Sequence, residues 1–178
     1  MRMKLMSGAA IIGCLLATAT EAHVGLSLTE APKGATFMLG FGIGHGCDGQ
    51  PTTTVRLQIP AGVIAVQPVA KPGWTIEIVN GAYTAPQTRD GAPVTEGVVQ
   101  INWTGGNLPN ELYDQFFIRA RIADNVETGA MVWFPIVQEC PGGGAHRWIT
   151  VPVEGQPEPA EPTPGLLVGA PAAAGHAH

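Results

Sequence analysis

Short runs of alternating hydrophobic and polar residues, separated by Gly and Pro, make up most of the chain. The clearest run is residues 36–43, where hydrophobic side chains occupy every second position from Phe37 to Ile43, as expected of a half-buried strand. Similar patterns predict strands over residues 24–28, 53–59, 63–66, 74–79, 98–103, 113–122, 131–137 and 147–153. Residues 80–97 favour a long hairpin or a mobile loop, and residues 105–109 a turn, because both stretches are rich in turn formers.

No segment keeps a helical period over three turns. Many short strands with turn signals between them predict an all-β fold, an antiparallel β-sandwich that is immunoglobulin-like or cupredoxin-like, over residues 23–153. Residues 154–178 are rich in Pro, Ala and Gly, and this composition predicts a disordered, flexible C-terminal tail. The tail ends in His-Ala-His, so His176 and His178 could bind a metal loosely or simply be solvated.

The first 22 residues have the features of a secretion signal. Two basic residues precede an apolar stretch at 5–19, and residues 20–22 form a small-x-small cleavage site. The apolar stretch is shorter than the ~20 residues of a spanning helix. Cleavage after Ala22 would release a mature chain into the periplasm or the extracellular space. In the alternative interpretation, residues 11–14 are a lipobox; a cut before Cys14 would then produce a lipoprotein in which His23 is internal.

Charge and cysteine content agree with an exported protein that does not bind nucleic acid. Without residues 1–22 the chain has 7 basic and 13 acidic residues, a formal charge of −6, which argues against nucleic acid or an anionic membrane surface as a partner. Two cysteines remain, Cys47 and Cys140, an even number in an oxidising compartment. A disulfide between them would close a loop of roughly 90 residues.

Cleavage after Ala22 would make His23 the first residue of the mature protein. The α-amino nitrogen and the ring Nδ1 of an N-terminal histidine can close a chelate ring on one metal ion. The α-amine is easily deprotonated, with a pKa near ~8, and imidazole is a common metal ligand. Nitrogen donors of this kind favour Cu(II) over other divalent first-row metals.

Other residues could complete a metal site around His23. Glu30 lies seven residues further on and can reach back only if the chain bends, so it is a candidate ligand or a solvated turn acid. Trp148 is either a core residue or a neighbour of the metal. His146 and His45 could each supply a second imidazole, although a loop histidine is more often solvent-exposed.

Several motifs between residues 23 and 153 resemble the YcnI-like copper-binding domain family: His-Val at 23–24, Pro-Thr-Thr at 51–53, Ile-Pro-Ala-Gly-Val at 59–63, Pro-Gly-Trp at 72–74 and Trp-Thr-Gly-Gly at 103–106. The resemblance implies an exported β-sandwich with a Cu(II) site called a mono-histidine brace, formed by the amine and ring of His23. It implies Glu30 as a carboxylate ligand and Trp148 as the tryptophan beside the metal. Some members carry an acid just before Pro-Thr-Thr, where this chain offers Asp48 as a possible further ligand.

We therefore expect a Cu(II) carrier or chaperone in copper homeostasis that is not an enzyme and exchanges metal with a copper transporter or chaperone of the cell envelope. Its affinity for copper should fall at low pH, because both nitrogens of His23 must be deprotonated to bind. One alternative is a copper-dependent oxidative enzyme, which would need a second imidazole from His146 or His45. Another is a metal-free β-sandwich interaction module.

Overall fold

The structure is a computed structural model, and it describes residues 23–171. The predicted signal segment and the two C-terminal histidines, His176 and His178, lie outside these residues. The described chain forms twelve strands and one 3-10 turn, η1 (Pro141–Gly143), and none of its helices has the length and hydrophobicity to cross a membrane. The strands are β1 (Gly25–Leu26), β2 (Glu30–Pro32), β3 (Thr36–Ile43), β4 (Thr52–Gln58), β5 (Val63–Pro68), β6 (Thr75–Arg89), β7 (Ala92–Leu108), β8 (Asp114–Ile122), β9 (Met131–Trp133), β10 (Ile136–Glu139), β11 (Ala145–Trp148) and β12 (Gly165–Gly169).

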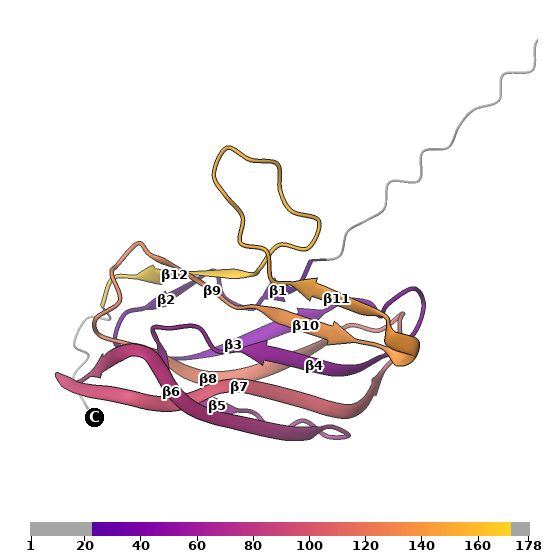
Figure 1. Cartoon of the computed structure of the whole chain (residues 1–178), viewed down its shortest axis with the longest axis horizontal. Helices are drawn as coiled ribbons and strands as arrows, with labels where there is room; N and C mark the ends of the chain where they lie inside the picture. Colours follow the sequence, from indigo (N-terminus) through magenta and orange to yellow (C-terminus); the bar gives the residue numbers. More distant parts are fainter. Residues whose placement is uncertain (1–22, 172–178) are drawn as a thin grey trace, which may run out of the picture.

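Two antiparallel sheets pack face to face around the hydrophobic core (Figure 1). One sheet has the strand order β1-β3-β8-β5, and the other has the order β11-β10-β4-β7-β6. Phe116 of the first sheet meets Trp103 of the second edge to face, with ring centroids 5.4 Å apart, and both side chains are fully buried. The antiparallel β-sandwich predicted from the sequence is confirmed.

Strand β3 has the bounds that its hydrophobic pattern predicts. It pairs with β8 without interruption from Thr36 opposite Arg121 to Ile43 opposite Asp114. Its side chains at Leu39, Phe41 and Ile43 are buried in the core. β3 therefore fixes the position of the loop that follows Ile43 at the end of the sandwich.

Strands β6 and β7 form a long hairpin. Of the two structures expected for residues 80–97, a long hairpin or a mobile loop, the hairpin is confirmed. β7 continues to Leu108, so the turn expected at residues 105–109 is wrong. A Cβ at Gly106 would lie 2.1 Å from the ring of Trp74, and Gly105 has φ +73°. The two glycines thus lie within an irregular part of β7. Gly105 adopts a positive φ there, and Gly106 leaves room for the ring of Trp74.

Residues 131–137 form two strands in different sheets, not the single strand expected. Pro135 has no N–H to donate to a sheet, and it separates β9 from β10. β10 pairs with β4 and β11 in the five-stranded sheet. β9 joins a small third sheet with the order β2-β12-β9.

The C-terminal region is more ordered than its composition suggests. β12 pairs in parallel with β2 and antiparallel with β9. Leu166 and Val168 are completely buried in the hydrophobic core. The flexible tail predicted from residue 154 onward is therefore wrong for β12, because three apolar residues within a Pro-rich and Ala-rich segment are enough to form a strand when two partner strands are available.

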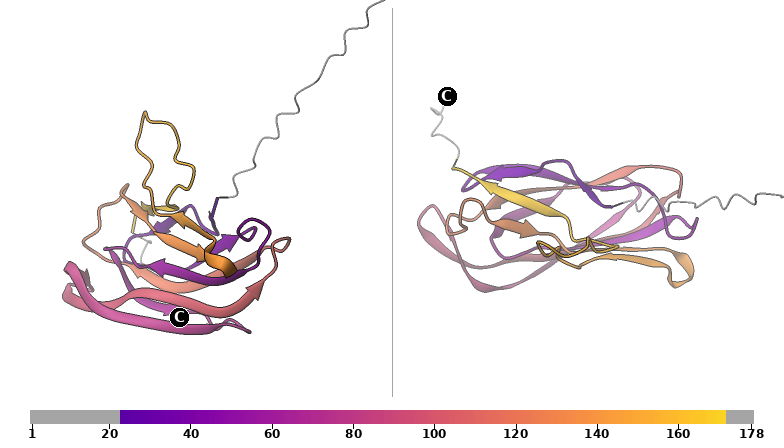
Figure 2. Two further views of the ribbon diagram at one scale, coloured as in Figure 1. Left: turned by 45° about the vertical axis from the view of Figure 1, so that its right-hand side comes forward. Right: turned by 90° about the horizontal axis from the view of Figure 1, so that it is seen from above.

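The segment between β11 and β12, residues 149–164, projects from the sandwich as a loop. Figures 1 and 2 show it in orange and yellow, rising beside the start of β1. We call it the β11–β12 loop. It returns to the body of the protein where the backbone N–H of Thr163 donates to the carbonyl of Thr150.

A disulfide joins Cys47, in the loop after β3, to Cys140, at the end of β10. The Cα atoms are 5.9 Å apart, and both residues are buried. The pairing predicted from the cysteine count is confirmed. The bond spans 93 residues and fixes the loop after β3 against the β10–β11 hairpin.

We expect the double variant Cys47→Ala/Cys140→Ala to lose about 4 kcal/mol of unfolding free energy, because the unfolded chain is no longer restricted by a long covalent loop. Urea unfolding measures the change. A reducing agent should lower the stability of the wild type by a similar amount and leave the double variant unchanged. Equal stability of the wild type in oxidising and reducing buffer would contradict the prediction.

We also expect truncation after Val153 to destabilise the protein by on the order of 3–6 kcal/mol, since it removes two buried aliphatic side chains worth about 1.5–3 kcal/mol each. Truncation after Pro171, which keeps β12, is the matched control and should unfold at the wild-type temperature. Thermal unfolding followed by circular dichroism compares them. Equal melting temperatures for the two truncations would show that β12 does not contribute.

Candidate functional site

A small, shallow hollow lies at the start of β1. It is open to solvent and encloses no space for an organic ligand, which would need a pocket of ~300–1,000 Å³. Three segments that are far apart in the sequence meet there: the start of β1, the end of β3 with its following loop, and the β10–β11 hairpin. The lining residues are His23, Val24, Gly42, Ile43, Gly44, His45, Gln138 and Trp148.

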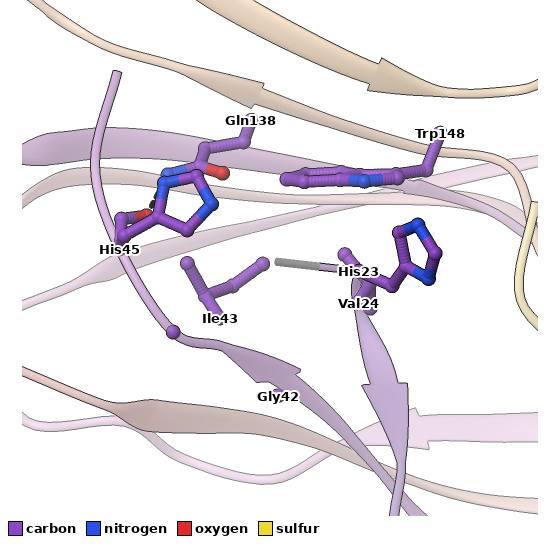
Figure 3. A pocket seen from close by; sticks show the side chains of 8 residues that line it. His23, Val24, Gly42, Ile43, His45, Gln138 and Trp148 are labelled. Atoms are coloured by element: carbon purple, nitrogen blue, oxygen red, sulfur yellow. Dashed lines mark hydrogen bonds between the residues drawn. The ribbon is translucent and has the colours of Figure 1, made fainter. Parts of the chain in front are cut away.

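Trp148 lies across this hollow, with His23 and His45 at opposite ends and Ile43 between them (Figure 3). The Trp148 side chain is 3% exposed and belongs to the hydrophobic core. The sequence left open whether Trp148 is a core residue or a neighbour of His23, and the structure places it in both positions. One face of the hollow is therefore rigid and apolar.

The ring of His23 is partly exposed, and a carboxylate stands close to it. Nδ1 of His23 is 3.9 Å from Oε1 of Glu158, which the β11–β12 loop carries over the start of β1. Both side chains face solvent, with 39% and 67% of their surface exposed. Such a contact contributes little to stability, but it brings a negative oxygen next to the ring nitrogen expected to chelate a metal.

Gln138 forms the inner wall of the hollow and is fully buried. Its Nε2 donates to the carbonyl of His45 at 2.6 Å and to the hydroxyl of Thr52 at 2.5 Å. Its Oε1 is buried, accepts no hydrogen bond from the described residues, and points toward the hollow in Figure 3. A buried carbonyl oxygen without a donor costs free energy, and its partial negative charge favours a positive charge nearby.

The structure brings His45 and His146 into contact, although 101 positions separate them in the sequence. Their rings meet edge to face with centroids 5.2 Å apart. His146 also stacks on Trp148, with ring centroids 5.4 Å apart and an angle of 28° between the planes. The two histidines that the sequence offered as alternative second imidazoles are thus neighbours.

Glu161, in the β11–β12 loop, fixes the position of His146. Its Oε1 lies 2.7 Å from Nδ1 of His146, and its Oε2 accepts the backbone N–H of Arg147 at 2.8 Å. Burial alone would raise the pKa of the Glu161 carboxyl, but the Arg147 N–H and the His146 ring together hold that pKa below its ordinary value. Glu161 is therefore a carboxylate near neutral pH.

The structure places two of the predicted ligands outside the hollow. Glu30 is exposed in β2, and its carboxylate lies beside Gly169 of β12. Asp48 is exposed at the tip of a tight turn, between Cys47 and Gln50, whose backbones exchange two hydrogen bonds. Within residues 23–171, no group of three or more His, Cys, Asp or Glu side chains is arranged to hold a metal ion.

Sequence reasoning missed Glu158, Glu161 and Gln138. Both acids were noticed only as part of a tail expected to be flexible, so no contact was expected from them. A signal was available, since these are acids in a segment otherwise poor in charge. Gln138 gave no signal, because a single polar residue in a strand is usually exposed.

Comparison with known proteins identifies the family. Residues 23–168 match a family described as a domain of unknown function, DUF1775. The chain belongs to this family, which is the YcnI-like family. The resemblance noted in the sequence motifs is thereby confirmed at the level of the family, and the match extends into β12, which the motifs did not reach.

The fold of this DUF1775 protein is similar to a solved structure titled "Crystal structure of an uncharacterized protein from Nocardia farcinica reveals an immunoglobulin-like fold". The two chains are 21% identical and superpose with a TM-score of 0.63, over 83% of this chain and 99% of the other. At this identity the likeness establishes the immunoglobulin-like fold. The search of curated proteins found no match.

Proposed function

We propose that this DUF1775 protein is an exported Cu(II)-binding protein that carries copper and is not an enzyme. The observation that carries the proposal is the position of His23. It lies at the edge of a shallow hollow lined by Trp148, with a carboxylate 3.9 Å from its ring Nδ1. The motifs shared with the copper-binding YcnI-like domain support the same function.

The donor atoms around the hollow fit Cu(II). A brace takes two nitrogens from a single residue, so it does not need three His, Cys, Asp or Glu side chains in one cluster. The α-amine and Nδ1 of His23 would hold the ion, which favours nitrogen donors. The buried Oε1 of Gln138, which has no donor among the described residues, makes the wall of the hollow receptive to positive charge.

The carboxylate of this site is better supplied by Glu158 than by Glu30. Glu158 already lies next to Nδ1 of His23. Glu30, which the sequence favoured, lies in β2 beside Gly169, and β2 is further along the sandwich than β1 in Figure 1. Because Glu158 is largely exposed, its loop can move without disturbing the core, which suits a site that must also release its ion.

A carrier needs export and a partner. Only cleavage after Ala22 converts the backbone nitrogen of His23 from an amide into an amine, so the full site would exist only outside the cytoplasm, in the periplasm or the extracellular space. The exchange partner would be a copper transporter or chaperone of the cell envelope. An oxidative enzyme is a weaker alternative, although His45 lines the same hollow.

The first prediction concerns the N-terminal amine. A mature chain that starts at His23 should bind its tightest Cu(II) at the brace, and a chain with Gly-Ser-Gly-Ser in front of His23 should bind this ion at least about tenfold more weakly, since the amine ligand is lost while the imidazole remains. Isothermal titration, with nitrogen couplings in the EPR spectrum, compares the two chains and His23→Ala. Equal affinities in all three would contradict the proposal, and copper-dependent oxygen consumption with a reductant would favour the enzyme.

The second prediction separates the two carboxylates. Glu158→Gln should weaken Cu(II) binding by about tenfold, whereas Glu30→Gln should leave it unchanged, because only Glu158 lies near the ring of His23. Both substitutions remove one negative charge from an exposed acid, so they are matched controls for the net charge. The reverse result would assign the ligand to Glu30 and remove Glu158 from the site.

A further inference from the structure

We infer that His45 and His146 form a second metal-binding site, made of two imidazoles, for a divalent late first-row metal ion such as Zn²⁺ or Cu²⁺. The site is distinct from the brace at His23 and does not depend on it. All its ligands are side chains, so it exists whether or not residues 1–22 have been removed.

The fold holds these two histidines together from several directions. His146 lies directly opposite Gln138 in the β10–β11 pair, and Gln138 donates to the backbone carbonyl of His45. The disulfide between Cys47 and Cys140 ties the loop of His45 to the same hairpin. The ring contact between His45 and His146 is therefore built into the sandwich.

In both rings one nitrogen is already occupied by an oxygen acceptor. Nδ1 of His45 lies 2.5 Å from the carbonyl of Gly46, and Nδ1 of His146 lies 2.7 Å from the carboxylate of Glu161. A carbonyl and a carboxylate can only accept, so each Nδ1 carries the proton and each Nε2 of the neutral ring keeps its lone pair. Neither Nε2 has a hydrogen-bond partner in the part of the chain that the structure describes.

This arrangement is the one that prepares histidines to bind metals. Metal-ligating histidines commonly donate their second ring N–H to a carboxylate or a backbone carbonyl, which fixes the tautomer and the orientation of the ring. His146 has the carboxylate, and His45 has the carbonyl. The stacking of His146 on the buried ring of Trp148 further fixes the plane of the His146 ring.

The spacing of the rings also suits one ion. Imidazole nitrogens bind Zn²⁺ at about 2.0–2.1 Å, so two rings on the same ion have centroids on the order of 5 Å apart. The centroids of His45 and His146 are 5.2 Å apart. Neutral imidazoles favour Zn²⁺, Cu²⁺ and Ni²⁺ over harder cations such as Mg²⁺ and Ca²⁺. Both side chains are only partly buried, so water can fill the remaining positions.

The test uses the mature chain with His23→Ala, His176→Ala and His178→Ala, which removes the brace and the C-terminal imidazoles. We expect this protein to bind one Zn²⁺ in isothermal titration. Adding His45→Gln or His146→Gln should lower the affinity at least tenfold, because each removes one of two ligands. Adding Asp48→Asn, a change in the same loop as His45, is the matched control and should leave the affinity unchanged.

A second measurement identifies the atoms and guards against misfolding. In ¹⁵N NMR spectra of the same background protein, Zn²⁺ should shift the Nε2 resonances of His45 and His146, while their Nδ1 atoms stay protonated. Absence of Zn²⁺ binding in this background would overturn the inference, as would binding that survives both His45→Gln and His146→Gln. Those results leave the His23 proposal standing, which fails separately if His23→Ala alone keeps full Cu(II) affinity.

Discussion

The Cys47–Cys140 disulfide is the constraint on which the functional end of the molecule depends. It connects the loop after β3, which belongs to one sheet, with the end of β10, which belongs to the other. The hydrogen bond from Gln138 to the carbonyl of His45 makes a second connection between the same two segments. Together they keep His45 beside His146 and hold the wall of the hollow next to His23 in place.

The β11–β12 loop places two carboxylates against the histidines of this end. Glu158 faces His23 and Glu161 faces His146, so the two acids of one loop serve two different histidines. Glu161 is tied to the backbone of Arg147, whereas Glu158 is mostly exposed. A fixed carboxylate suits the orientation of a ligand, and an exposed one suits the uptake and release of an ion.

The strands that bury one face were predictable, because alternation of apolar residues is a local signal: β3 has its predicted bounds and β8 differs by one residue. The strand predictions were wrong where pairing with strands distant in the sequence decided the structure. Pro135 divides β9 from β10 between two sheets, and Gly106 accommodates the ring of Trp74 within a strand. β12 forms because it can pair with β2 on one side and with β9 on the other.

By itself, the sequence determined the class of fold and the pairing of Cys47 with Cys140, and it drew attention to His23 as the residue after a predicted cleavage site. The class of fold follows from the local alternation of hydrophobic and polar residues, and the pairing follows from the presence of only two cysteines after residue 22. Only the tertiary structure decided which side chains surround His23. The contacts of His23 with Glu158, and of His45 with His146, join positions more than a hundred residues apart, and such distances are set by sheet register and the disulfide, which no local pattern encodes.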